Sequence, residues 1–509
     1  MNRDRSFAPP FAGPIEATTA AGASSPTAVA RALPLSIRLV YGLGEASNSI
    51  KSFTFGLFLL FFYTSVLGLP GTLVGLAISL GLVWDAAIDP LIGYASDRLR
   101  LPWGRRHALM LAGSLAMGLT FYAIFRPPPG LAQGALFAWL MGTSLLLRTA
   151  NSLFMVPYHA LGAELSRDYH ERTAITGARA AFALLGTLVA AALSFAVFFP
   201  NTTPEIDPKF NPSGYATMAL AFGLAMTALG LATTWGTRAH RSLASQARDD
   251  DAPGFAAGLW LALRHPPFLL LTLAASLFFL ASVVNATVAI HYLTYYAGIT
   301  DSRALSGFQL SFYVGGLLGV GLWVRAARRI DKRLVAFIAT LLVALLMIAA
   351  YALVGAGRPL GTGNLTALLI GNGLAGFFAS ALWALPASMI ADVTDLDALV
   401  SGQRREGAFF GIYSFSQQVA ASVAVLVSGL LVDHFAGLAP GQMAQTAHTI
   451  DRLAMLFGPL PAALVLIAAL LFLGYPLTHQ RVREIQAQLA RREARGCIME
   501  GQGGTGVGS

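Results

Sequence analysis

Apolar stretches of roughly 20 residues recur throughout the chain, and each is about long enough to cross a hydrocarbon core of about 30 Å. Charged residues make up only 12% of the sequence, against about 25% in ordinary soluble domains. A soluble chain of 509 residues could not bury this much apolar surface, because single cores stop growing near about 250–300 residues. The pattern therefore excludes a soluble enzyme and a disordered protein, and it predicts an all-α, multi-pass membrane protein.

Twelve membrane-spanning helices are expected, in two sets of six. They cover 38–66, 71–99, 106–126, 131–161, 173–199 and 214–237 in the first half, and 267–298, 303–327, 333–355, 364–391, 406–436 and 452–476 in the second. The predicted organisation is a flexible tail (1–36), a six-helix bundle (37–238), a polar linker (239–265), a second six-helix bundle (266–477) and a basic, Gly-rich tail (478–509).

The placement of the 34 Lys and Arg residues predicts the orientation in the membrane. Most of them fall in the two tails and in the even-numbered loops, so the positive-inside rule places both termini in the cytoplasm. The formal charge of +9 is thus explained by topology in a plasma membrane, and no nucleic-acid partner is expected. The single cysteine, Cys497, lies in the last tail and excludes a disulfide framework or a cysteine metal site.

Two loops at corresponding places in the two halves resemble each other. The segment 97–106 follows the second expected span, and the segment 325–333 follows the eighth; both are short and strongly basic. This echo indicates a duplicated six-helix unit, which is typical of transporters that rock one bundle against the other.

Two carboxylates lie within the second expected span, where each charge costs about 2.5–3.5 kcal/mol on insertion scales. Asp85 and Asp89 are four residues apart, so they share one helical face about one turn apart. Both cannot be ionised at that separation without a counter-charge, so either one is protonated or the pair shares a cation. Pro90 frees a backbone carbonyl one turn earlier as another oxygen ligand. A purely structural role, in hydrogen bonds to neighbouring helices, remains the alternative.

The fourth expected span carries Arg148, Ser152, Met155 and His159 on one face at helical spacing. A buried guanidinium needs a carboxylate, so Arg148 either pairs with one of the two aspartates or holds an anionic substrate. For His159, packing is favoured over a proton relay.

Other polar and aromatic side chains lie within the spans. They are Glu45, Asn48, Ser49 and Lys51 on the first span, Asn285, His291, Tyr292 and Tyr295 on the seventh, and Trp383 on the tenth. The rings mixed with polar groups on the seventh span suit an amphipathic or ring-shaped ligand, although an interfacial-belt role is favoured for Tyr295. Trp383 is expected either to pack in the core or to offer a stacking surface.

Three sequence blocks together resemble the glycoside–pentoside–hexuronide:cation symporter family of the major facilitator superfamily. The first runs from Trp84 to Arg98 and on to Arg106, as W-D-A-A-I-D-P-L-I-G-Y-A-S-D-R and W-G-R-R. The second is V-P-Y-H-A-L from Val156, followed by Glu171-Arg172-Thr173 and Arg179, and the third is A-D-V-T-D from Ala391 with R-R-E-G from Arg404. The resemblance implies the major facilitator fold for the two predicted bundles.

The resemblance also implies roles for individual residues. Asp85 and Asp89 would form the cation site, with Ser152 offering a hydroxyl, and Arg179 and Trp383 would contact substrate. Three positions depart from the family pattern: Ser49 and Met155 replace sugar-binding acids, and Gln418 replaces a lysine. The full expected substrate site comprises Asn48, Ser49, Arg148, Asn151, Met155, His159, Arg179, Asn285, Tyr292, Trp383, Tyr413 and Gln418. Gating is expected from Asp97, Arg98, Arg105, Arg106, Arg172, Asp392, Arg404 and Arg405.

The function expected from these observations is cation-coupled symport of a sugar, glycoside or uronate by alternating access. The coupling ion would be Na⁺ or H⁺, and a monomer without cofactor or other metal is expected in the bilayer. Because sugar-binding carboxylates are missing and some relatives carry lysolipids, a carrier of a lysolipid-like or other anionic amphiphile, with altered or no coupling, is the alternative. An intramembrane Mg²⁺-dependent prenyltransferase, using Asp85/Asp89 and the acids at 392, 395 and 397, is a remote one. The acids at 392, 395 and 397 are expected in a loop, not within a span, which disfavours this enzyme.

Overall fold

The computed structural model describes residues 33–98, 105–165, 169–199, 207–240, 264–402 and 405–503, and within these ranges the chain forms helices, turns and connecting segments. The helices of the first half are α1 (Leu35–Phe61), α2 (Gly71–Arg98), α3 (Arg105–Ile124), α4 (Gln133–Glu164), α5 (Tyr169–Phe198) and α6 (Pro212–Gly236). Those of the second half are α8 (Pro266–His291), α9 (Ser302–Ala327), α10 (Lys332–Leu353), α11 (Leu365–Ala379), α12 (Ala381–Ser401), α13 (Glu406–Leu430), α14 (Ala447–Phe457), α15 (Pro459–Leu473) and α16 (His479–Gly503).

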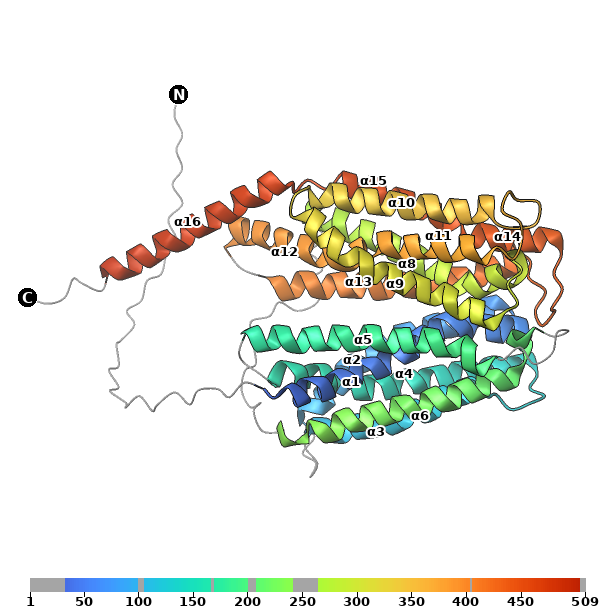
Figure 1. Cartoon of the computed structure of the whole chain (residues 1–509). Helices are drawn as coiled ribbons and strands as arrows, with labels where there is room; N and C mark the ends of the chain where they lie inside the picture. Colours follow the sequence, from blue (N-terminus) through green and yellow to red (C-terminus); the bar gives the residue numbers. More distant parts are fainter. Residues whose placement is uncertain are drawn as a thin grey trace, which may run out of the picture.

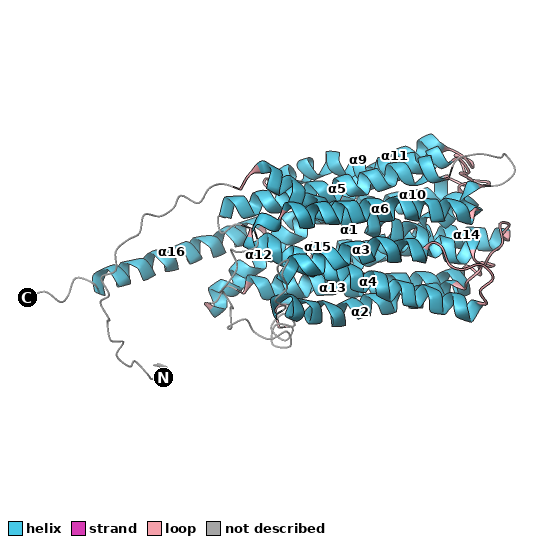
Figure 2. Ribbon diagram, turned by 90° about the horizontal axis from the view of Figure 1, so that it is seen from below, coloured by secondary structure: helices cyan, strands magenta, loops and turns pink. Residues whose placement is uncertain are grey.

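The helices form two bundles that lie side by side (Figure 1). In one, α1 packs on α5 and α6, and α3 packs on α4 and α6; in the other, α8 packs on α13 and α15, and α10 packs on α11 and α15. Both views show α16 extending from one end of the molecule and α14 at the opposite end (Figures 1 and 2). We call the end that holds α16 and the start of α1 the terminal end, and the opposite one the far end.

Eleven segments in the described part of the chain are long and apolar enough to cross a membrane. The helix α4 is not among them although it has 32 residues, and its polar side chains, Arg148 and Asn151 among them, account for its lower hydropathy. The all-helical membrane fold predicted from the sequence is therefore confirmed. The initial tail lies outside the described residues except for its last few, and so does nearly all of the linker.

Two expected spans are each divided into two helices. The span expected at 364–391 is broken at Ser380 into α11 and α12, and the span expected at 452–476 is broken at Gly458 into α14 and α15. The helix α12 also continues past residue 391 and ends at Ser401, where Gly402 adopts the left-handed conformation (φ 73°) that terminates helices. Placing Asp392 and its neighbouring acids in a loop was therefore wrong: they lie on the last turns of a helix.

The bundles approach most closely where α2 meets α13 at the far end. Glycines make this contact possible, because a Cβ atom on Gly429 would lie 2.2 Å from the carbonyl oxygen of Gly71, and one on Gly75 would lie 2.9 Å from that of Val425. Any larger side chain at Gly429 would have to push the two backbones apart.

Polar bonds also join the bundles at the far end. The Asp433 carboxylate accepts from the backbone N–H groups of Gly71 and Thr72, both at 2.7 Å, and so caps α2 from the opposite bundle. Thr64 contacts the buried His291 at 3.1 Å, so this seventh-span histidine joins the two bundles. Of the hydrogen bonds between bundles that join two described residues, the pair exchanged by Ser79 and Ser422 lies nearest the terminal end. The bundles are therefore closed together at the far end.

A buried lysine in the connection between α5 and α6 adds to this closure. The Lys209 ammonium donates to the carbonyl of Ile299 at 3.0 Å, and its Nζ lies 2.7 Å from the Asp207 carboxylate. Burial lowers the pKa of Lys209, and Asp207 opposes that shift by stabilising the charged form. The lysine thus links the first bundle to the backbone that precedes α9.

Candidate functional site

Intramembrane charges gather in the first bundle on four helices. Arg179 of α5 binds Glu45 of α1 through two nitrogens, at 2.9 and 3.0 Å. Arg148 of α4 forms an ion pair with Asp85 of α2, and its guanidinium lies 5.7 Å from the centre of the Phe55 ring on α1. Since α2 and α4 pack directly on each other, the two predicted candidates Arg148 and Asp85 are partners in this state.

Asp89 is the carboxylate that no arginine neutralises. Its Oδ1 atom is buried and has no hydrogen-bond partner among the described residues, and the same holds for Asp85 Oδ1 and for Oδ1 of Asn151 on α4. The Ser152 hydroxyl of α4 interacts with the Asp89 carboxylate. Carboxylate, amide and hydroxyl oxygens are the ligands that hard cations prefer, so the donor set fits a small monovalent cation or a proton.

A third base, Lys51 on α1, completes the charge balance of this region. It interacts electrostatically with Arg148, Asp85, Asp89 and Glu45, but no carboxylate of the described residues lies within ion-pair distance of it. Sequence reasoning had noted Lys51 and Glu45 as polar without assigning them to the site. The signal was present in the sequence: away from the ends of the first six spans, the acids Glu45, Asp85 and Asp89 balance the bases Lys51, Arg148 and Arg179.

The predicted polar residues near Glu45 serve mainly to surround it. Asn48 donates to the Glu45 carboxylate at 3.4 Å, and His159 Nε2 lies 3.8 Å from it. The Ser49 hydroxyl donates to the backbone carbonyl of residue 45 at 2.9 Å. The structure thus brings Asn48, His159 and Arg179 together around one carboxylate.

Two predicted substrate contacts are instead packed in the protein interior. Met155 is 6% exposed in a cluster with Tyr41, Phe154 and Tyr158. Tyr292 is fully buried, stacks on Phe457 at 4.1 Å and donates its hydroxyl proton to the carbonyl of Ala350. In this state both side chains therefore contribute to core packing.

A cavity of about 730 Å³ lies in the second bundle against α1. None of the described residues that line it is charged. Its walls are mostly aliphatic and aromatic, and they include the predicted residues Asn285, Trp383 and Tyr413. Gln417 lines it and Gln418 does not, so the expected glutamine contact is displaced by one position on α13.

The predicted gating residues that the structure describes lie near the terminal end. Asp392 binds Lys332 at 2.6 Å, and Arg405 lies 3.4 Å from Asp397, so each of these pairs stays within the second bundle. Arg106 is buried. The side chains of Asp97, Arg98, Arg105 and Arg172, and the whole of Arg404, lie outside the described residues.

The Arg148–Asp85 pair predicts strong non-additivity. Arg148→Met or Asp85→Ala alone leaves one half-buried charge unpaired, which costs about 3–5 kcal/mol, whereas the double substitution removes both charges and costs much less. We expect the melting temperature of the purified protein to fall in each single variant and to recover in the double variant. Arg303→Met, at an exposed site, is the matched control. Additive losses in the double variant would contradict a direct pair.

The two helical bundles are joined at the far end. One holds an intramembrane charge network, and the other holds the uncharged cavity of about 730 Å³, called the central cavity below. This arrangement defines an integral membrane transporter. The comparisons with known proteins agree. The family model described as MFS/sugar transport protein matches residues 40–479, and the chain belongs to this family of the major facilitator superfamily.

Relatives that act on different substrates resemble the chain to a similar degree. It is 25% identical to the sodium-dependent lysophosphatidylcholine symporter 1-A of Danio rerio (89% of this chain, 87% of the relative). It is 24% identical to the putative glycoside/cation symporter YagG of Escherichia coli (91% and 96%). The solved D-xylose-proton symporter has the same fold, with a TM-score of 0.61 at 12% identity over 87% of this chain and 98% of that one. The protein is a transporter and not an enzyme, so the prenyltransferase alternative is excluded.

Proposed function

We propose that this transporter is a monomeric, cation-coupled symporter with both termini in the cytoplasm. Its twelve spans would be the eleven long apolar segments together with α4. The two bundles would correspond to residues 37–238 and 266–477. The terminal end would then face the cytoplasm, which the concentration of arginines there supports. With the bundles joined at the far end, the state described here would be inward-facing.

The coupling cation, Na⁺ or H⁺, would bind at Asp89. Asp85 Oδ1, Asn151 and Ser152 would supply further oxygens, and Arg148 would hold Asp85 in place. The support is that Asp89 carries a buried carboxylate oxygen without a hydrogen-bond partner among the described residues, beside a proline that frees a helix carbonyl. Binding of the cation would neutralise this charge. It would favour reorientation of the bundles, because the cation binds the two conformational states with different affinities.

The substrate class that the geometry supports best is an amphiphile with a charged head and a long apolar chain. The observation that carries this proposal is the separation of charge: the lining of the cavity is uncharged, while acids and bases gather on α1, α2, α4 and α5 of the first bundle. Ser52, Phe53 and Gly56 of α1 line the cavity, whereas Lys51 faces the charge network. Exposed side chains such as Ile370 and Leu374 also line the cavity, which suits entry from the bilayer.

A glycoside or uronate is the second candidate. It is favoured by Trp383, which is 47% exposed at the cavity wall and offers a stacking face for a sugar ring. Asn285, Asn372 and Gln417 line the same cavity and could bind hydroxyl groups, although the Asn285 amide already donates to the carbonyl of Phe457 at 2.6 Å.

Counterflow in proteoliposomes separates the two candidates. Lysophospholipids, neutral glycosides and uronates are each preloaded inside vesicles, and uptake of the labelled compound is measured with and without Na⁺. We expect saturable counterflow of a lysophospholipid, and counterflow of glycosides alone would contradict the amphiphile assignment.

Filling the cavity should shorten the acyl chain of the lysolipid that the protein can bind. A Cβ atom on Gly371 meets nothing within 4 Å, and the residue lines the cavity, so Gly371→Phe places a ring inside it. Each methylene that can no longer be buried costs about 0.8 kcal/mol, so an 18-carbon lysolipid should lose at least about tenfold in apparent affinity while a 10-carbon one changes little. Gly321→Phe, which also meets open space but does not line the cavity, is the control. Equal losses of apparent affinity for both acyl-chain lengths would mean that the acyl chain binds outside this cavity.

A further inference from the structure

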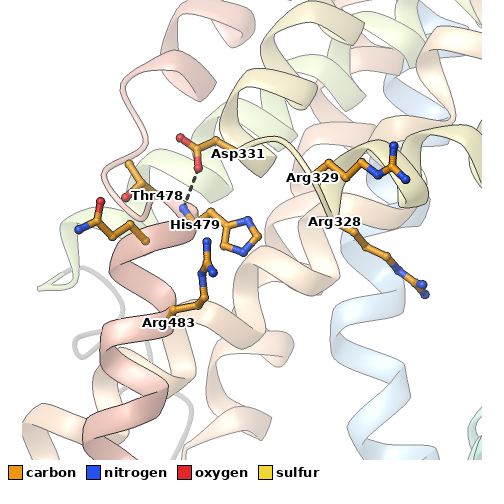
Figure 3. A pocket seen from close by; sticks show the side chains of 7 residues that line it. Arg328, Arg329, Asp331, Thr478, His479 and Arg483 are labelled. Atoms are coloured by element: carbon orange, nitrogen blue, oxygen red, sulfur yellow. Dashed lines mark hydrogen bonds between the residues drawn. The ribbon is translucent and has the colours of Figure 1, made fainter.

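A second cavity, of about 580 Å³, lies at the terminal end where α9, α10 and α16 come together. It is lined by Arg328, Arg329, Asp331, Thr478, His479, Gln480 and Arg483 (Figure 3). The loop between α9 and α10 supplies the first two arginines, and the first turns of α16 supply His479 and Arg483. Two segments about 150 residues apart in the sequence thus build one basic site.

The site is held together by its own acidic residue. Asp331 Oδ1 accepts a hydrogen bond from the backbone N–H of His479 at 2.7 Å, as Figure 3 shows, and Asp331 Oδ2 lies 3.6 Å from Arg333 Nε. Asp331 therefore positions the start of α16 with one carboxylate oxygen and lies near Arg333 with the other. It does not neutralise the three arginines of the cavity.

Those three arginines carry uncompensated charge. In the part of the chain that the structure describes, no carboxylate lies within ion-pair distance of Arg328, Arg329 or Arg483, whereas Arg333, Arg405 and Arg481 near this end each have one. Figure 3 shows the Arg483 guanidinium beside the His479 ring, with Arg328 and Arg329 across the site. A guanidinium without a carboxylate is suited to a phosphate, which it binds through two parallel hydrogen bonds.

The position of the cavity indicates where the phosphate comes from. Ile330, in the middle of the arginine loop, is 46% exposed, and the last turns of α9 and α15 expose Leu322 (52%) and Leu473 (40%). These apolar surfaces are where the membrane-spanning helices meet lipid, so the arginines lie at the level of the headgroups. Basic residues at that level attract anionic lipids.

We propose that this cavity binds the phosphate group of an anionic membrane lipid and so anchors α16 to the membrane surface. This site is separate from the central cavity and the charge network, and the inference does not depend on the proposed transport function. The lipid would bridge the loop between α9 and α10 and the first turns of α16, and its acyl chains would lie along the exposed leucines.

Lipid retention by the full-length protein tests this proposal. The protein is purified in detergent with phosphatidylglycerol or phosphatidylcholine, and bound lipid is counted by native mass spectrometry. We expect preferential retention of phosphatidylglycerol, and on the order of 100-fold weaker retention in Arg328→Gln/Arg329→Gln/Arg483→Gln, because each basic residue at a membrane surface strengthens binding roughly fivefold.

Two control variants make the result specific. Arg303→Gln/Arg481→Gln/Arg491→Gln removes three exposed arginines that do not line the cavity and should retain phosphatidylglycerol as the unmodified protein does. The triple Arg→Lys variant at the cavity keeps the charge and should lose much less than the Gln variant, which separates loss of binding from misfolding. Equal losses in the cavity and control Gln variants would overturn the proposal. Glycerol phosphate competing as well as the lipid would overturn the lipid as the source of the phosphate.

Discussion

Asp89→Asn is expected to abolish cation-driven accumulation of substrate while exchange of substrate across the membrane continues. A carrier that moves one cation with a substrate of zero net charge gains about 2.3 kcal/mol from a potential of 100 mV, which is enough for roughly 40-fold accumulation. An asparagine cannot take up a proton and holds Na⁺ far more weakly than a carboxylate, so the variant should only equilibrate its substrate. The measurement is the ratio of internal to external substrate in energised proteoliposomes, together with counterflow.

The control is Asp395→Asn, which removes a carboxylate at the terminal end that accepts a hydrogen bond from the Gln486 amide at 3.1 Å. It should accumulate substrate as the unmodified protein does. Full accumulation by Asp89→Asn would remove Asp89 from the coupling mechanism, and simultaneous loss of counterflow and of folded protein would indicate a structural role.

Gly429→Val is expected to reduce transport at least about tenfold by keeping the far end open. A Cβ atom at this position would lie 2.2 Å from the carbonyl oxygen of Gly71, and it would meet backbone that cannot turn aside as a side chain can. The bundles could then no longer close around the Asp433 cap of α2, and the state that is closed at the far end would be depopulated.

The chain is well suited to measuring this shift, because Cys497 is its only cysteine. With Cys497 replaced by Ser, a cysteine introduced at Thr72 reports on the far end. It should be protected from a membrane-impermeant maleimide in the unmodified background and labelled in Gly429→Val. Gly411→Val on the same helix meets nothing within 4 Å and should change neither transport nor labelling. Labelling that does not respond to Gly429→Val would contradict the assigned closure.

The helical fold could be predicted because a spanning helix leaves a local signal. About 20 consecutive apolar residues are required regardless of what the helix contacts, so the spans were found without tertiary information. Helix ends were harder. Nothing local distinguishes the break at Ser380 from a continuous span, and α12 runs on to Gly402 because backbone conformation at a glycine, rather than polarity, ends it.

The charge network was partly predictable for a related reason. An unpaired charge within a membrane span has a high free-energy cost. The presence of Asp85, Arg148 and Arg179 within the spans therefore indicated a network of charged partners. Which acid binds which base depends on how α2, α4, α5 and α1 pack, and no local pattern encodes that. Asn285 and Trp383 line the same cavity, whereas Tyr292, on the same expected span as Asn285, is buried against Phe457.

Lysophospholipid uptake under imposed ion gradients tests the proposed symport most directly. Purified protein is reconstituted into vesicles, and labelled lysolipid is followed with an inward Na⁺ gradient, with an inward H⁺ gradient, or with neither, against protein-free vesicles. One of the two gradients should concentrate the lysolipid inside above its equilibrium distribution, and Asp89→Asn should eliminate that excess. Equilibration at the same final level under all three conditions would contradict cation-coupled transport.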